Sequence, residues 1–228
     1  MNESIAGNKQ RCDFHTHSLL SDGELLPIEL IRRCVDKKYK AVAITDHVSL
    51  FNAEEVVISL VKECELAMKH WDIIAIPGVE ITHVPPAKIA EVASLARKAG
   101  AKLVNVHGET PVEPVPPGTN SAAIEAQVDV LCHPGFITEK ECEKAKENGV
   151  YLEITSRHGH SYTNGHVAAL CSRFGNNVLI NSDTHEVHDL ITYDFSWKVA
   201  RGAGLSNTMA ARAIDEEPLK LLKWLGYL

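Results

Sequence analysis

The sequence has no long apolar run and no start that resembles an export signal. No stretch reaches the roughly 18 consecutive apolar residues that a membrane span needs, and residues 1–10 are polar, with no apolar segment behind a basic start. These absences argue against a membrane anchor and against export. We therefore expect a cytoplasmic protein with no membrane partner.

Paired cysteines and an excess of positive charge are missing as well. The six cysteines form no C-x-x-C pair, and most lie in apolar segments, as reduced core cysteines do. The formal net charge is -7 at pH 7, which argues against a broad basic face. We expect no stable binding of duplex nucleic acid, whereas a small or single-stranded substrate is compatible with this charge.

The remaining composition is that of an ordinary globular protein. Apolar residues make up 45% of the chain and charged residues 23%, and 228 residues suit a single core. We expect a polar N-terminal extension over residues 1–10 and one domain over residues 11–228, in an oligomeric state that the sequence leaves open.

Short β-branched runs alternate with helix-like segments along most of the chain. Repeated βα units require a mainly parallel sheet covered by helices, so the pattern predicts a distorted, seven-stranded βα barrel in the α/β class, with a doubly wound open sheet as the alternative. The expected strands are 12–15, 41–45, 73–79, 103–107, 128–132, 150–154 and 178–181. The expected helices are 27–37, 54–69, 86–99, 120–126, 139–148 and 164–174, followed by helical pieces near 197–201, 206–212 and 218–224 that we expect to close the barrel.

Metal-ligating residue types occur at the ends of these strands. His15 and His17 form an H-x-H pair, and alternate residues of an extended chain point to one face, so both imidazoles can reach one ion. Strand ends of a βα barrel converge on one face of the fold. A carboxylate and histidine cluster there needs a cation to offset its charge, so the sequence predicts a multinuclear metal site. The other candidates near strand ends are Asp22, Asp46, His47, Glu80, His107, His133, Asp183 and His185.

Six ordered motifs resemble those of the PHP superfamily, which includes histidinol phosphatases and polymerase-associated phosphoesterases. They are D-F-H-T-H-S-L-L-S-D-G, I-T-D-H, G-V-E-I-T, N-V-H-G-E, C-H-P-G and N-S-D-T-H, and they span residues 13–185. The resemblance implies a PHP-type phosphoesterase domain that holds three metal ions in a distorted barrel.

The resemblance also implies a ligand set for each ion. His15, His17, Glu80 and Asp183 surround a first ion; Glu80 bridges to a second, held by His107 and His133; Asp22, His47 and His185 hold a third. Asp22 stands where some members of the superfamily have histidine, so the identity of the metal stays open. Mixed nitrogen and oxygen ligands suit zinc, manganese or iron.

The segment that follows the sixth expected strand supplies candidates for contact with a substrate. Arg157 can form paired hydrogen bonds with a phosphate, and His158 and His160 lie nearby as proton donors or secondary contacts. A solvated loop is the alternative interpretation for these three residues. We expect His70, His83 and His166 to be surface or capping residues, and Asp46 to orient its neighbour or a ligand histidine without binding metal.

These observations predict a metal-dependent phosphoesterase with two or three divalent ions. The leading hypothesis is hydrolysis of a small phosphomonoester by a hydroxide that bridges two ions, with Asp22, His158, His160 or the third ion assisting the leaving group. One alternative is a phosphodiesterase or exonuclease acting on nucleotides or single strands. The other is a catalytically silent PHP barrel that serves as a scaffold.

Overall fold

Parallel strands form the centre of the computed structural model, which describes residues 10–228. Residues 1–9, most of the expected N-terminal extension, lie outside the described part. The strands are short apolar runs buried on both faces, as parallel strands covered by helices are. Within residues 10–228 they are β1 (Arg11–Asp13), β2 (Tyr39–Ile44), β3 (His47–Val48), β4 (Ile74–Ile81), β5 (Leu103–His107), β6 (Val130–Cys132), β7 (Tyr151–Thr155) and β8 (Val178–Asn181).

The strands form a nearly closed barrel. Their order is β1-β2-β4-β5-β6-β7-β8, all neighbours are parallel, and the two-residue β3 pairs with β4. The edges β8 and β1 meet just beyond their ends, where Thr16 and Thr184 form a parallel bridge and His17 N donates to the Thr184 carbonyl at 2.8 Å. Seven of the strands match the predicted ones, and the predicted barrel is confirmed over the open-sheet alternative; β3 was not predicted.

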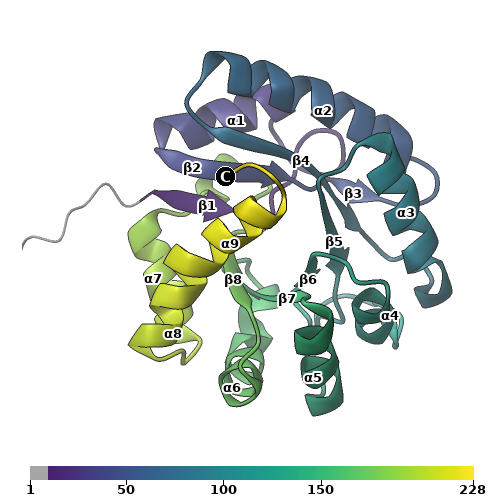
Figure 1. Ribbon diagram of the computed structural model, residues 1–228, viewed down its shortest axis with the longest axis vertical. Helices are drawn as coiled ribbons and strands as arrows, with labels where there is room; N and C mark the ends of the chain where they lie inside the picture. Colours follow the sequence, from purple (N-terminus) through teal and green to yellow (C-terminus); the bar gives the residue numbers. More distant parts are fainter. Residues whose placement is uncertain (1–9) are drawn as a thin grey trace, which may run out of the picture.

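Helices surround these strands (Figure 1). Several end at glycines in the left-handed conformation, among them Gly100, Gly149 and Gly175, each of which precedes the next strand. In the described residues the α-helices are α1 (Pro27–Asp36), α2 (Ala53–His70), α3 (Ile89–Ala99), α4 (Thr119–Glu125), α5 (Glu139–Asn148), α6 (Asn164–Phe174), α7 (Tyr193–Gly202), α8 (Asn207–Ala211) and α9 (Glu217–Trp224). Short 3₁₀ turns lie at Pro86–Lys88, His160–Thr163 and Val187–Asp189, and a π-helical turn at Arg212–Glu216 joins α8 to α9.

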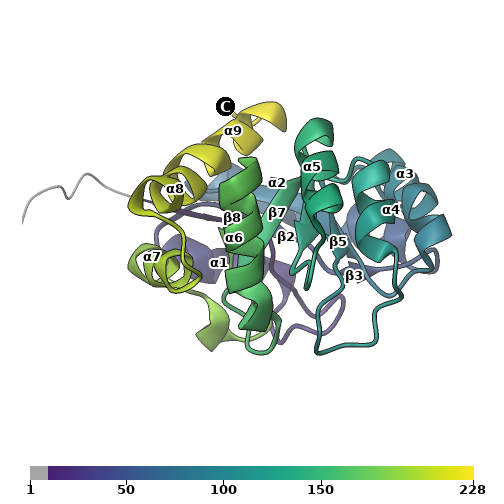
Figure 2. The same cartoon turned by 90° about the horizontal axis from the view of Figure 1, so that it is seen from below.

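The hydrophobic core has two layers. The larger layer lies between the strands and the surrounding helices, and the smaller one fills the barrel, where Phe14, Ala43 and Leu179 pack together. Leu221 and Leu222 of α9 join the inner layer, so this last helix covers one end of the barrel, as expected for the tail. Figure 2 shows α8 and α9 on the side of the domain where the chain ends. Among residues 10–228 we find no helix with the length and apolar character that a membrane crossing needs.

Candidate metal and phosphate site

A hollow of about 310 Å³ lies at the carboxyl ends of the strands, where barrels of this class carry their active sites. Histidines and carboxylates from separate strand ends meet there, so the barrel brings together residues that are far apart in the sequence. The hollow is lined by Asp22, His47, Glu80, Thr82, His83, His107, Glu113, His133, Arg157, His160, Asp183 and His185.

The H-x-H pair after β1 lies beneath this hollow, completely buried. His15 Nε2 lies 3.3 Å from Glu80 Oε1 and 3.5 Å from Asp183 Oδ1. His17 Nε2 lies 3.2 Å from Asp183 Oδ1 and 3.7 Å from Glu80 Oε2. The chain then folds back at Gly23, where a Cβ atom would come within 2.3 Å of the His17 carbonyl oxygen, so this turn requires glycine.

Two further groups adjoin this pair. His133 Nε2, after β6, lies 3.4 Å from Glu80 Oε1, and the ring of His107 lies 4.4 Å from that of His133. On the other side, Asp22 lies 3.4 Å from His47 Nε2 through Oδ1 and 3.2 Å from His185 Nε2 through Oδ2. The structure thus brings together all nine residues that the sequence predicted as ligands.

The charges in the cluster favour cations. Burial raises the pKa of a carboxyl, but in Glu80 the imidazoles of His15 and His133 outweigh it and hold the pKa well below its ordinary value. His15 and His17 do the same for Asp183. Burial is the main cause that lowers the pKa of His47 to about 4, which leaves this imidazole neutral and able to ligate.

The donor atoms fit divalent ions. Tetrahedral bonds of about 2.0–2.1 Å separate two ligand atoms by roughly 3.4 Å, close to the spacings seen here. Among residues 10–228, the buried atoms without a hydrogen-bond partner include His15 Nε2, both ring nitrogens of His17 and Glu80 Oε1. Buried polar atoms are normally paired, so an ion is the partner that this geometry suits.

Strained backbone coincides with the cluster. Five described non-glycine residues have positive φ, and three of them line the hollow: His83 (53°), His133 (27°) and Asp183 (54°). Such conformations are costly outside glycine and tend to occur at functional sites. The fold therefore maintains an unfavourable backbone where the candidate ligands project.

Two buried carboxylates orient this cluster from behind. Glu153, inside β7, accepts hydrogen bonds from His15 Nδ1 at 2.8 Å, from His133 N at 2.9 Å and from Asn181 Nδ2 at 2.9 Å. Glu153 is not among the residues predicted for the site, although an acidic residue within a buried parallel strand was a usable signal. Asp46 accepts from Ser18 N, Ser18 Oγ and Ser21 Oγ, so it fixes the turn that carries Asp22, and these bonds join it to no ligand histidine.

The segment after β7 contributes Arg157 and His160 to the hollow. Arg157 Nη1 donates to Asp189 Oδ2 at 2.8 Å, and this is the one side-chain hydrogen bond of its guanidinium within the described chain. His160 Nδ1 lies 2.8 Å from Thr110 Oγ1, and its ring stacks on His133 at 4.2 Å. His158 is exposed, contacts Tyr162 and does not line the hollow.

The proline-rich loop between β5 and α4 carries two carboxylates with different surroundings. Glu109 accepts hydrogen bonds from Gly118 N and Asn120 N, so it stabilises the start of α4. Glu113 instead faces the hollow, 3.0 Å from His83 Nε2 and 3.2 Å from His107 Nε2. His83 is 38% exposed, as expected of a surface residue, and it also borders the hollow.

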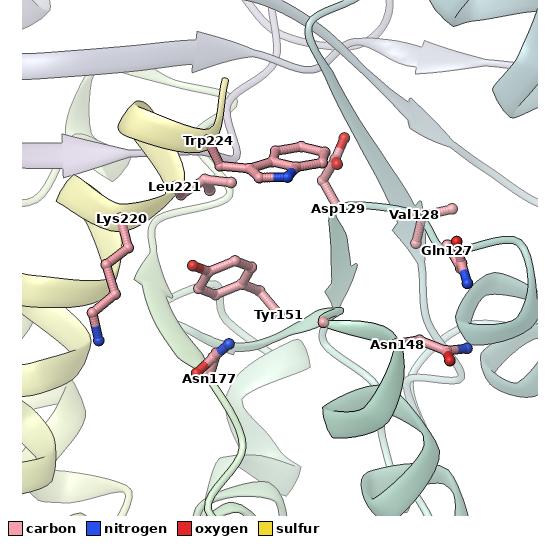
Figure 3. A pocket seen from close by; sticks show the side chains of 10 residues that line it. Gln127, Val128, Asp129, Asn148, Tyr151, Asn177, Lys220, Leu221 and Trp224 are labelled. Atoms are coloured by element: carbon pink, nitrogen blue, oxygen red, sulfur yellow. The ribbon is translucent and has the colours of Figure 1, made fainter. Parts of the chain in front are cut away.

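A second hollow, of about 400 Å³, lies at the opposite ends of β6 and β7 (Figure 3). Tyr151, Lys220 and Trp224 border it together with side-chain amides, and no histidine does. It is larger than the hollow at the carboxyl ends, but its one carboxylate, Asp129, is paired with Arg97 and with Val104 N, so it offers no cluster of metal ligands. The candidate site is therefore the smaller hollow.

Comparisons with known proteins agree with the motifs. The PHP domain matches residues 13–108. Uncharacterized protein MJ1295 of Methanocaldococcus jannaschii is 49% identical over 215 residues, covering 93% of this chain and 99% of that protein. Probable phosphatase NT01CX_1282 of Clostridium novyi is 28% identical over 133 residues, covering 50% of this chain and 54% of that protein.

A solved structure shares the fold. Histidinol phosphate phosphatase of Lactococcus lactis, complexed with zinc, L-histidinol and phosphate, aligns with a TM-score of 0.58 and 14% identity, covering 86% of this chain and 95% of that one. At this identity the likeness concerns the fold alone. The family match and the relative from Methanocaldococcus jannaschii confirm the resemblance seen in the six motifs: this chain belongs to the PHP domain family.

Proposed function

We propose that this protein is a metal-dependent phosphoesterase that hydrolyses a small phosphomonoester. The observation that carries this proposal is the position of a guanidinium, that of Arg157, in the same hollow as a cluster of buried, unpaired ligand atoms. Phosphoryl transfer needs just these two elements, cations and a planar hydrogen-bond donor, to neutralise the phosphoryl oxygens.

Nine residues would hold two or three divalent ions, of zinc, manganese or iron. When bound in such a site, divalent ions polarise a phosphoryl oxygen and activate water as a nucleophile. The ligands fall into three sets that share Glu80 between the first two: His15, His17, Glu80 and Asp183; Glu80, His107 and His133; and Asp22, His47 and His185.

The chain's own residues position the substrate. Asp189 holds one edge of Arg157 and itself accepts from His185 N at 2.9 Å and Glu186 N at 3.0 Å. This carboxylate therefore links Arg157, the proposed phosphate-binding residue, to the loop that carries the proposed metal ligand His185. The remaining guanidinium nitrogens of Arg157 are available to bind two oxygens of one phosphate.

The leaving group requires a proton near the phosphate. His160 lies in the hollow and has one ring nitrogen anchored on Thr110, so it is the residue we propose for this transfer. Asp22 is less suited, because His185 and His47 outweigh the effect of burial and lower the pKa of its carboxyl well below the ordinary value. His158 is exposed and does not line the hollow, so it is poorly placed to donate this proton.

The size and charge of the site favour a monoester. A hollow of about 310 Å³ suits one small molecule, and the net charge of -7 offers no extended basic surface for a polynucleotide. Similarity to the Clostridium novyi protein, a probable phosphatase by name, and the fold shared with a histidinol phosphate phosphatase also support a phosphoesterase.

Protein purified without chelator tests the proposal in one panel. Phosphomonoesters, bis(p-nitrophenyl) phosphate and a short single-stranded oligonucleotide are compared at equal enzyme concentration, with metals measured in the same samples. We expect metal-dependent release of phosphate from at least one monoester, faster than turnover of either diester. Preferred turnover of the oligonucleotide would replace the monoester proposal by the diesterase alternative, and metal-loaded protein that turns over nothing in the panel would refute it.

A further inference from the structure

The carboxylate of Glu113 contacts three histidines that come from three separate segments of the chain. Its Oε2 lies 3.0 Å from His83 Nε2 and 3.2 Å from His107 Nε2, and its Oε1 lies 3.3 Å from His160 Nε2. Only His107 among these three belongs to the nine proposed ligands. Among the described residues, Glu113 supplies the one carboxylate within 4.0 Å of His107 Nε2.

The contact between Glu113 and His107 needs a proton or a metal ion between the two atoms. His107 Nδ1 lies 3.2 Å from the Gly108 carbonyl oxygen, which can only accept a hydrogen bond, so the ring proton of a neutral His107 resides on Nδ1. Nε2 then presents a lone pair to a carboxylate oxygen. Two lone pairs at 3.2 Å repel each other unless a second proton or a metal ion binds there.

The spacing matches that of neighbouring ligands. Across the proposed cluster, the histidine nitrogens lie 3.2–3.5 Å from the nearest carboxylate oxygens, as for His17 with Asp183 and His15 with Glu80 and Asp183. Glu113 Oε2 has the same relation to His107 Nε2. Once an ion binds His107, this oxygen lies within reach of the same ion.

We propose that Glu113 is an additional metal ligand at the ion position of His107 and His133, and that the phosphate of the substrate displaces it. This inference rests on the proposed function, because it assumes that ions occupy the cluster. The proposal adds a ligand that is carried by a loop. When the substrate binds, this ligand would leave the ion and its coordination position would become free for the phosphate.

The surroundings of Glu113 suit a displaceable ligand. Its side chain is 37% exposed, whereas that of Glu80 is 1% exposed, so water and substrate can reach it. Four prolines in the segment 109–119 restrict the loop, and His83 and His160 hold the carboxylate over the hollow without being proposed ligands.

Cobalt titration tests the ligand. Chelator-treated wild type, Glu113→Gln and the control Glu125→Gln, which removes an exposed carboxylate from α4, are titrated with Co²⁺ and followed by visible absorption and by equilibrium dialysis. We expect Glu113→Gln to bind one class of cobalt at least tenfold more weakly, with the other sites and the control unchanged. Equal affinity in all three proteins would overturn the inference, and wild type that binds no cobalt would overturn the proposed function with it.

Phosphate titration tests the displacement. Inorganic phosphate is added to each protein at saturating cobalt, and the change in the cobalt spectrum gives its dissociation constant. We expect phosphate to bind Glu113→Gln at least threefold more tightly than wild type, because no anionic ligand has to leave. If Glu113→Gln binds cobalt more weakly but binds phosphate equally or more weakly than wild type, Glu113 is a metal ligand and its displacement by phosphate is refuted.

Discussion

Replacing Arg157 with alanine removes the guanidinium that lines the hollow beside the proposed metal ligands. A hydrogen bond to a charged partner contributes about 1.5 to 3 kcal/mol, and roughly 1.4 kcal/mol corresponds to a factor of ten in rate. We therefore expect kcat/KM toward a phosphomonoester to fall by roughly tenfold to a hundredfold or more. The assay is steady-state phosphate release with a monoester on which the wild type is active.

The fold should tolerate this change. Arg157 and Asp189 form a half-exposed ion pair, with side chains 31% and 29% exposed, and such pairs contribute about 0 to 1 kcal/mol to stability. Asp189 keeps its hydrogen bonds from His185 N and Glu186 N when the arginine is lost. For a domain of this length, the melting temperature should fall by less than about 4 °C, and metal content should stay the same.

Two variants control the experiment. Arg157→Lys should restore activity only in part, because lysine keeps the charge and loses the planar pair of donors. Arg173→Ala, which removes an exposed arginine paired with Glu139 on the outer face, should leave kcat/KM unchanged. Unchanged kcat/KM in Arg157→Ala would refute the reasoning and leave phosphate binding to the metal ions alone.

The remaining predictions concern the metals and their supports. Elemental analysis should find two or three transition-metal equivalents per chain, and less than one after repletion would contradict the three ligand sets. Removing these ions with a chelator should lower the melting temperature reversibly, since ions that bind only the native state stabilise it by about 2.7 kcal/mol at a hundred times Kd. Glu80→Gln should reduce kcat more than His83→Ala at equal metal loading, and the reverse order would show that the ligand assignment near β4 is wrong. Glu153→Gln should weaken metal binding by about tenfold to a hundredfold and lower the free energy of unfolding by about 1–3 kcal/mol, because one carboxylate oxygen becomes an amide nitrogen that cannot accept a hydrogen bond. Unaltered metal affinity would limit Glu153 to a structural role.

The barrel could be predicted because each βα unit repeats the same local pattern. Apolar runs mark the strands, and glycines such as Gly149 mark helix ends with the conformation expected of them. The missed strand, His47–Val48, has two residues and exists only because it pairs with β4, a long-range contact that no local pattern reveals. Helix α7 begins at Tyr193, four residues before the predicted segment, because Thr192 Oγ1 accepts a hydrogen bond from Phe195 N.

The candidate ligands could be predicted because strand ends have a fixed place in a barrel. The strands that carry or precede His15, Glu80 and Asp183 place these residues at the site, independently of how the loops fold. The proline-rich loop has no such rule: its sequence places two glutamates shortly after a strand end, and no local pattern tells which of them faces the site. Glu109 stabilises α4 and Glu113 faces the hollow, and the difference lies in how the whole loop folds.

The strain in this site has one common explanation. His133 and Asp183 have positive φ, His15 and His17 bury nitrogens that have no hydrogen-bond partner in the described chain, and Glu153 binds His15 from behind. The left-handed backbone and the buried unpaired nitrogens both oppose folding of the metal-free protein, whereas the hydrogen bond that Glu153 accepts from His15 stabilises it. Bound cations would pair the nitrogens and relieve carboxylate repulsion at the same position, so the features that destabilise the empty cluster are those that give it affinity for ions.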